Sequence, residues 1–249
     1  MCRVSTEDYA SAFQSTCKEN FSEGRSGAFL FYSSDQRFVC KSTTKVELTA
    51  LRRIMPTYVQ FLAKHPNSLL CRFVGAHCLR MYGNELNFLV MMNVFPSHRL
   101  EERFDLKGSW VNRHGFKGGK TITERSLKEQ AFSSVVYMDN DLQSKISLGE
   151  GVAAGMAEQI FYDVGFVEGH NLMDYFLLVG VKMQRFQVPD LQLVRGDDRD
   201  LEENDGGLRS AFVQGPGRYY CGIIDVLQEW NFKKRIERFA KVYLLGQEV

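Results

Sequence analysis

Short apolar runs occur in the first hundred positions of the chain, a pattern that is typical of β-strands. Turn-forming residues divide these runs into two pairs, and the four expected strands are residues 28–32, 37–41, 69–81 and 86–95. Between the pairs, apolar residues recur at helical spacing from Lys45 to Ala63, which predicts a helix. We expect Ser42 or Thr43 to cap this helix and Pro56 to kink or split it.

The remainder of the chain is expected to combine helices and strands. Apolar periodicity predicts a helix over 148–166, buried strands over 172–181 and 219–227, and a basic amphipathic helix over 231–245. Residues 184–217 show no apolar period and contain an acidic run, so we expect a solvated loop there. The pattern as a whole predicts the α+β class, with an antiparallel sheet and one helix in the first part and a mixed arrangement in the second.

The 249-residue chain has an ordinary composition, with 44% hydrophobic and 24% charged residues. These values exclude disorder, collagen and coiled coil as descriptions of the whole chain. No apolar run approaches the roughly 18 residues that a transmembrane helix needs, and the first residues lack the apolar stretch of a signal peptide. The six cysteines form no CxxC pair, so we expect no zinc site and a reduced, cytoplasmic setting.

Charge is balanced over the whole chain but unevenly distributed along it. The net charge is +1, yet residues 190–209 hold seven acids and three arginines, so the remaining residues carry +5. A C-terminal basic cluster consists of Lys233, Lys234, Arg235 and Arg238. Near an anionic leaflet each cation contributes about 1 kcal/mol, so we expect this cluster to contact a membrane surface, with a solvated helix face as the alternative. No nucleic-acid motif is visible, and we expect no nucleic-acid partner.

Candidate phosphate-binding residues lie at both ends of the first strand pair. Gly24 and Gly27, with Ser26 between them, precede it, and glycine lets backbone N–H groups approach phosphate oxygens. Lys41 ends the second strand and can reach the same phosphates, while Glu47 on the following helix can orient that lysine. The plain alternatives are a hairpin with a surface lysine and a first-turn glutamate that the helix dipole favours.

Two aspartates, Asp174 and Asp225, lie inside apolar runs, where an ionised carboxylate is costly unless it is paired or bound to a metal. We expect the two to share a site in which one accepts a hydroxyl proton and the other holds Mg²⁺. The alternative is a pair of strand-end acids that face solvent. Lys107, on a glycine turn, can meet a phosphate or a lipid headgroup, or it is part of a basic surface loop.

Taken together and in order, these segments resemble the phosphatidylinositol phosphate kinase family. The most specific strings are FDLKGS at 104–109 and MDYFLLVG at 173–180, and the resemblance runs from about residue 20 to 245. It implies a lipid kinase of two lobes, distantly similar to protein kinases, in which residues 1–95 form the N-lobe and residues 96–249 the C-lobe. The loop 184–217 would be an insert in the C-lobe.

The resemblance also implies the reaction and its participants. Mg-ATP would phosphorylate a ring hydroxyl of a phosphatidylinositol monophosphate on the cytosolic face of a membrane, giving a bisphosphate. The implied nucleotide-binding residues are Gly24, Ser26, Gly27, Lys41, Glu47 and, at the hinge between the lobes, Met92, Asn93 and Val94. Asp174 would take the position of the catalytic-loop aspartate, Asp225 would hold Mg²⁺, and Lys107 would belong to the basic catalytic cleft. Some family members pair through their N-lobes, and a homodimer is left open.

The chain departs from the family pattern in three ways. Phe176 stands where the family usually has serine, and Met138 stands where it has the lysine of a Lys-Asp-x-Asp motif. Only 24 residues follow Asp225, so the loop that selects the lipid is largely absent, as expected of a fragment or a truncated member. A second interpretation is therefore a member with impaired catalysis that binds ATP or phosphoinositide as a scaffold. A protein kinase is disfavoured, because neither an HRD-x4-N nor a DFG string is present.

Overall fold

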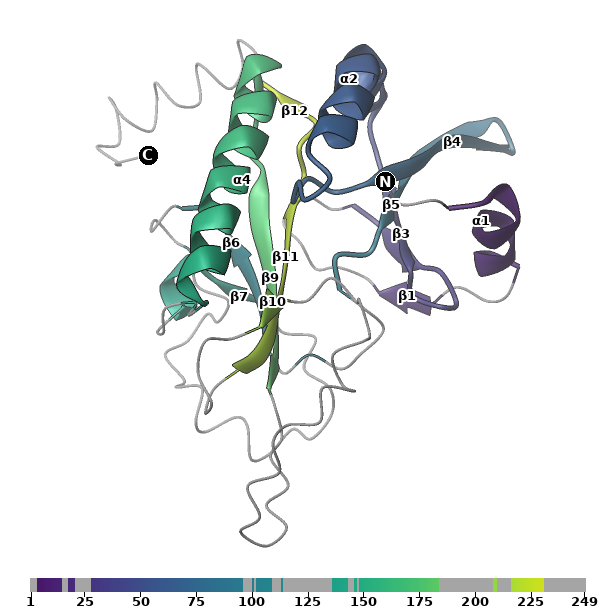
Figure 1. Ribbon diagram of the computed structural model, residues 1–249. Coiled ribbons are helices and arrows are strands. Elements are labelled where there is room, and N and C mark those ends of the chain that lie inside the picture. The colour runs from purple at the N-terminus through teal and green to yellow at the C-terminus, as the bar shows by residue number, and fades with distance from the viewer. Residues whose placement is uncertain are drawn as a thin grey trace, which may run out of the picture.

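The computed structural model contains two five-stranded sheets that are joined through a common core (Figure 1). It describes residues 4–14, 18–20, 28–95, 100, 102–108, 113, 136–142, 146, 148–183, 208–209 and 216–230. Helices and strands are both present and the sheets are largely antiparallel, so the predicted α+β class is confirmed. The division of the chain into lobes near residue 95 stays a prediction.

The first sheet is antiparallel and has the strand order β1-β2-β3-β5-β4. Its strands are β1 (Lys18–Asn20), β2 (Leu30–Tyr32), β3 (Phe38–Ser42), β4 (Phe73–Met81) and β5 (Asn84–Met92). The short helix α1 (Thr6–Ala12) packs on this sheet through Ala12, against Phe38 and Val90. The four strands expected from the sequence are present, although β4 begins later than predicted because residues 69–71 bond to the other sheet.

The second sheet has the strand order β10-β11-β9-β6-β7. Its strands are β6 (Glu102–Leu106), β7 (Tyr137–Met138), β9 (Phe176–Met183), β10 (Leu208–Arg209) and β11 (Pro216–Ile224). All neighbours are antiparallel except β6 and β7, which run parallel. The short strands β10 and the start of β11 fall within the expected loop 184–217, which is therefore not loop throughout. The rest of that segment and the predicted helix 231–245 lie outside the described residues.

Two expected strands are each broken in the structure. The run 172–181 divides into β8 (Leu172–Met173) and β9, and the run 219–227 ends at Ile224 and resumes as β12 (Gln228–Glu229). At the breaks, the φ angles of Asp174 and Asp225 are 61° and 62°, in the left-handed region. A left-handed residue turns the backbone out of its extended path, so the ladder of hydrogen bonds cannot continue through it.

The helix α2 (Lys45–Lys64) confirms the predicted helix but differs from it at two points. Thr44, rather than Ser42 or Thr43, is the N-cap, because Thr44 and Glu47 form a reciprocal capping box. Pro56 lies inside α2 without dividing it. The carbonyl that loses its partner to this proline belongs to Arg52, and both residues are exposed, so water can take the place of the missing N–H.

One core cluster fastens α2 and the helix α4 (Glu150–Gly169) to both sheets. It contains Ile54 of α2, Leu89 of the first sheet, Val167 of α4 and Ile223 of the second sheet. The backbone crosses between the sheets as well, because the Cys71 N–H donates to the carbonyl of Ile223 at 2.8 Å. Within the described part, neither of these helices nor α1 has the length and apolar character needed to cross a bilayer.

Because Ile54 is fully buried at this junction, we expect Ile54→Ala to lower the free energy of unfolding by about 2–5 kcal/mol. The matched control is Val46→Ala in the same helix, where the side chain is 62% exposed and the expected change is within about 0.5 kcal/mol. Urea unfolding of the two variants measures both values. Equal effects of the two substitutions would contradict a core that passes through α2.

Candidate functional site

Two aspartates lie at matching breaks in neighbouring strands. β9 and β11 pair as far as Phe176 and Ile224, and β8 and β12 pair on the other side of the gap. Asp174 and Asp225 occupy the two sides of that gap, both with a left-handed backbone. Such a conformation costs about 1–3 kcal/mol outside glycine and is concentrated at functional sites. The strand register therefore places both acids at one point of the structure.

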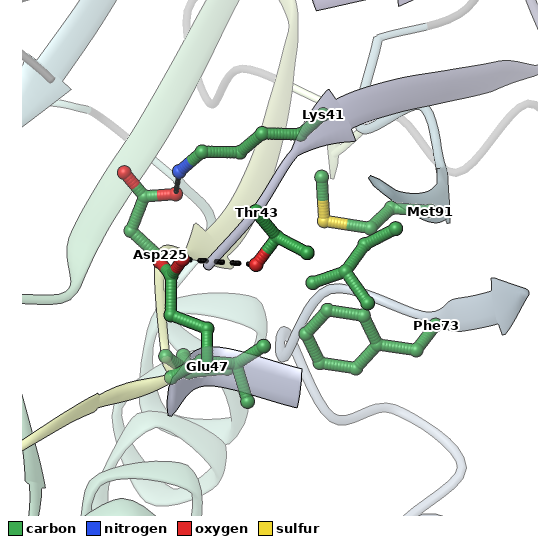
Figure 2. A pocket seen from close by; sticks show the side chains of 9 residues that line it. Lys41, Thr43, Glu47, Phe73, Met91 and Asp225 are labelled. Atoms are coloured by element: carbon green, nitrogen blue, oxygen red, sulfur yellow. Dashed lines mark hydrogen bonds and ion pairs between the residues drawn. The ribbon is translucent and has the colours of Figure 1, made fainter. Parts of the chain in front are cut away.

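Each aspartate forms an ion pair with a lysine from a different element. Lys41 Nζ, from β3 of the first sheet, donates to Asp225 Oδ1, and Figure 2 shows the two side chains pointing toward each other. Lys107 Nζ, just beyond β6, donates to Asp174 Oδ1 at 2.8 Å. The structure thus brings together four of the side chains that the sequence singled out, as two lysine–aspartate pairs.

Glu47 is not the ion-pair partner of Lys41 in this structure. Its Oε2 accepts hydrogen bonds from the Thr44 N–H at 2.7 Å and from the Thr43 and Thr44 hydroxyls at 2.9 Å each. Burial raises the pKa of Glu47, but these donors and the charge of Lys41 outweigh burial, so the pKa lies below its usual value. The carboxylate therefore stays ionised close to Lys41 while it caps α2.

A small pocket lies behind the Lys41–Asp225 pair (Figure 2). Lys41, Glu47 and Asp225 form its polar side, and its apolar side is formed by Phe73, Leu89, Met91, Val226 and Leu227. The pocket therefore places the lysine–aspartate pair next to an apolar surface.

A buried aspartate fixes the backbone that carries Lys107. Asp139 Oδ1 accepts from the N–H groups of Lys107 at 2.9 Å and Gly108 at 2.7 Å, and Oδ2 accepts from Arg113 Nε at 2.7 Å. Gly108 has a φ of 72°, which glycine adopts without strain. Burial raises the pKa of Asp139, but Arg113 and the two N–H groups outweigh burial and set the pKa below its usual value.

Arg113 connects this arrangement to the second sheet. Its Nη2 donates to the carbonyl of Asp105 at 2.6 Å and to Asp105 Oδ1 at 2.8 Å. Burial raises the pKa of Asp105, and the charges of Asp225 and Asp139 raise it further, so that it lies above its usual value despite Arg113. Sequence reasoning missed Arg113, Asp105 and Asp139 as site residues. Their one signal was their place within or beside the FDLKGS and Asp-x-Asp strings.

The two residues that depart from the family pattern both border this site. Phe176 begins β9, and its ring lies 5.2 Å from Lys107 Nζ and 5.5 Å from Arg113 Cζ, measured to the ring centroid. Met138 pairs with Asp105 across β6 and β7, and its N–H donates to Asp141 Oδ2 at 2.9 Å. Phe176 thus contacts both cations of the Asp139 network.

The predicted hinge residues lie where the chain leaves the first sheet. Met92 ends β5, the Asn93 N–H donates to the carbonyl of Arg37 at 2.8 Å, and Val94 packs against Gly222 of β11. A Cβ on Gly222 would come within 2.6 Å of Val94, so glycine is required for this close approach. Gly24, Ser26, Gly27 and the C-terminal basic cluster lie outside the described residues.

The site fits a magnesium ion that is bound together with a phosphate ligand. Among the described residues, no three His, Cys, Asp or Glu side chains gather as a complete metal site. Mg²⁺ is commonly bound by one or two carboxylates with substrate phosphates and water as the other ligands. Asp225 offers such a carboxylate, partly exposed beside Lys41. Asp105 lies close by, because the charge of Asp225 contributes to the raised pKa of Asp105.

The comparisons with known proteins all point to one family. The model of the phosphatidylinositol-4-phosphate 5-kinase family matches residues 11–248. A probable phosphatidylinositol phosphate kinase of Dictyostelium discoideum is 30% identical over 90% of this chain. A phosphatidylinositol 5-phosphate 4-kinase type-2 alpha of Gallus gallus is 31% identical over 91% of it, and phosphatidylinositol 4-phosphate 5-kinase 1 of Arabidopsis thaliana is 36% identical over 66%. The chain spans 38%, 64% and 21% of the lengths of these three relatives, respectively.

The depressed pKa of Asp139 gives a prediction for stability against pH. The ionised carboxylate stabilises the fold above about pH 4, the unfolded value, and this contribution is lost as pH falls through the lower folded value. We expect Asp139→Asn to lower the free energy of unfolding by about 3 kcal/mol at pH 7, because a buried charge pair is broken. Urea unfolding from pH 3 to 7 should show that the free energies of unfolding of the wild type and Asp139→Asn approach each other as pH falls. A difference between them that does not change with pH would contradict this role.

Proposed function

Because the chain belongs to the phosphatidylinositol phosphate kinase family, we propose that it transfers the γ-phosphoryl group of ATP to a ring hydroxyl of a phosphatidylinositol monophosphate. The observation that carries the proposal is the pair of lysine–aspartate contacts at one break in the strands. Phosphoryl transfer needs little beyond positioning and stabilisation of charge on the moving group. Two cations and two carboxylates supply both.

In the proposed reaction, the two aspartates have different tasks. Asp174 accepts the proton of the attacking hydroxyl, while Lys107 beside it stabilises charge on the transferred group. Asp225 holds Mg²⁺, which when bound with the nucleotide neutralises negative charge on the phosphate oxygens. Lys41 contacts the ATP phosphates. When phosphate enters, Lys41 exchanges its bond to Asp225 for one to phosphate, and the carboxylate of Asp225 becomes free to act as a ligand.

We propose that the nucleotide binds beside the hinge, and from the sequence we assign Gly24 and Gly27 to its phosphates. The adenine would lie against backbone groups of Met92, Asn93 and Val94, at the point where β5 ends. The apolar residues Leu89 and Met91 on the same strand face the pocket beside Lys41. This arrangement directs the phosphates from the hinge toward the two lysine–aspartate pairs.

The lipid substrate would be reached at an anionic membrane surface. The C-terminal basic cluster supplies the electrostatic attraction, with no span of the bilayer required. The relatives are named for two different ring positions, a 4-phosphate 5-kinase and a 5-phosphate 4-kinase. The test must therefore offer each monophosphate separately.

A second candidate function is phosphoinositide or ATP binding without turnover. Met138 favours it, because the family has a lysine at this position and the chain lacks that charge beside Asp139. A binding module would retain affinity for nucleotide or for anionic vesicles and give no product.

We expect Asp174→Asn and Asp225→Asn each to lower turnover by about 10²- to 10⁴-fold, because one removes the proton acceptor and the other a metal ligand. The assay follows phosphate transfer from Mg-ATP to vesicles that carry one phosphatidylinositol monophosphate at a time. Asp8→Asn on the surface of α1 is the matched control and should retain full activity. Asparagine tolerates a left-handed backbone, so the thermal unfolding midpoint of both site variants should remain close to that of the wild type.

Turnover by either variant near the wild-type rate would contradict the roles assigned to the two aspartates. A wild-type chain that makes no product on any monophosphate, yet binds ATP or anionic vesicles, would instead establish the second candidate function.

A further inference from the structure

Phe176 contacts two of the cations of the site, Lys107 and Arg113, without adding charge. We propose that Phe176 is a positioning residue for phosphoryl transfer: its ring face holds Lys107 and Arg113 and so fixes the ammonium group of Lys107 beside Asp174. The proposal rests on the proposed function. It accounts for an aromatic residue at the start of β9, next to the break that contains Asp174.

The contacts of Phe176 meet the geometry of cation–π interactions. Lys107 Nζ and Arg113 Cζ lie over the ring at 5.2 and 5.5 Å from its centroid, inside the distance of about 6 Å at which a cation is attracted to the ring face. Arg113 is only 8% exposed, so its side of the contact is largely shielded from water. Both cations therefore contact the same neutral ring.

Among the described residues, the hydrogen bonds of Lys107 lie at the two ends of a flexible side chain. Its backbone N–H is bound by Asp139, and its ammonium group is bound by Asp174. Four rotatable bonds separate these two points, and a lysine side chain adopts many rotamers between them. The ring of Phe176 restricts this freedom because it favours the rotamers that keep the ammonium over its face.

A ring suits this position better than a further polar group would. The described site already contains Asp105, Asp139, Asp174 and Asp225, so another carboxylate near Lys107 would repel an incoming phosphate. The ring attracts cations through its quadrupole and leaves the net charge of the site unchanged. A serine hydroxyl at the same place would leave the faces of both cations to water.

Fluorinated phenylalanines at position 176 test the proposal, because fluorine withdraws charge from the ring face and changes the shape of the side chain little. Phenylalanine would be replaced in turn by its 4-fluoro, 3,5-difluoro and pentafluoro forms in the full chain. We expect kcat for phosphoinositide phosphorylation to fall stepwise, by about fivefold over the series, a size typical of cation–π contacts. The KM for ATP should change much less, because the proposed task of Lys107 is to stabilise charge on the transferred group and not to bind the nucleotide.

The same series at Phe161 is the matched control, since that ring is 76% exposed on α4 and lies outside the site. It should leave kcat unchanged. Phe176→Ser, which installs the residue usual for the family, should lower kcat at least as far as pentafluorophenylalanine does. A flat response to fluorination at 176, or a higher kcat in Phe176→Ser, would overturn the proposal.

A double-mutant cycle separates this proposal from the proposed function, because it requires no turnover. The thermal unfolding midpoints of Phe176→Leu, Lys107→Met and the double variant are compared with that of the wild type. A contact between ring and ammonium predicts that the shift in the double variant is smaller than the sum of the single shifts. Additive shifts would overturn the contact. If the shifts are non-additive but the wild-type chain makes no product, the contact is retained and the proposed reaction is rejected.

Discussion

Two backbone hydrogen bonds set the geometry on which the site depends: the Cys71 N–H donates to the carbonyl of Ile223, and the Ile223 N–H donates to the carbonyl of Leu69. They join the segment before β4 to the end of β11, so the two sheets are connected two residues before Asp225. β4 pairs with β5, and β5 pairs with β3, which carries Lys41. The position of Lys41 relative to Asp225 is therefore fixed by a short path of main-chain bonds, and the shared core around Ile54 packs over that path.

Acidic and basic side chains from several parts of the chain lie next to one another around the site. Asp139 bonds to Arg113, Arg113 bonds to Asp105, and Asp105 lies close enough to Asp225 to respond to its charge. A buried pair such as Arg113 with Asp139 adds little to stability compared with apolar packing. Its value here is positional, because the same Asp139 carboxylate bonds the backbone of Lys107 and so directs that side chain before any substrate arrives.

The sequence predicted the longer regular elements well because they depend on local periodicity, but the short elements α1, β6 and β7 were not expected. It predicted the site less well because the site depends on tertiary contacts. α2 was expected within one residue of its observed end, whereas its true cap required the pairing of Thr44 with Glu47 to be recognised. The breaks at Asp174 and Asp225 were missed, since the apolar runs continue on both sides of each aspartate. The burial of Arg113 could not be inferred from a basic, glycine-rich segment, because it results from partners on distant strands.

Asp174 and Asp225 have a left-handed backbone, which is strained for aspartate. At these two positions, therefore, the residue that is best for stability differs from the residue that is best for activity. Glycine would relieve the strain at either place and asparagine would tolerate it, and an aspartate codon reaches either residue by a single base change. A lineage released from the need for turnover could therefore exchange these carboxylates for glycine, which relieves the strain, or for asparagine without loss of stability, as stability and activity commonly trade off at strained sites. Stability-directed engineering of this chain would favour glycine at both positions unless they were held fixed.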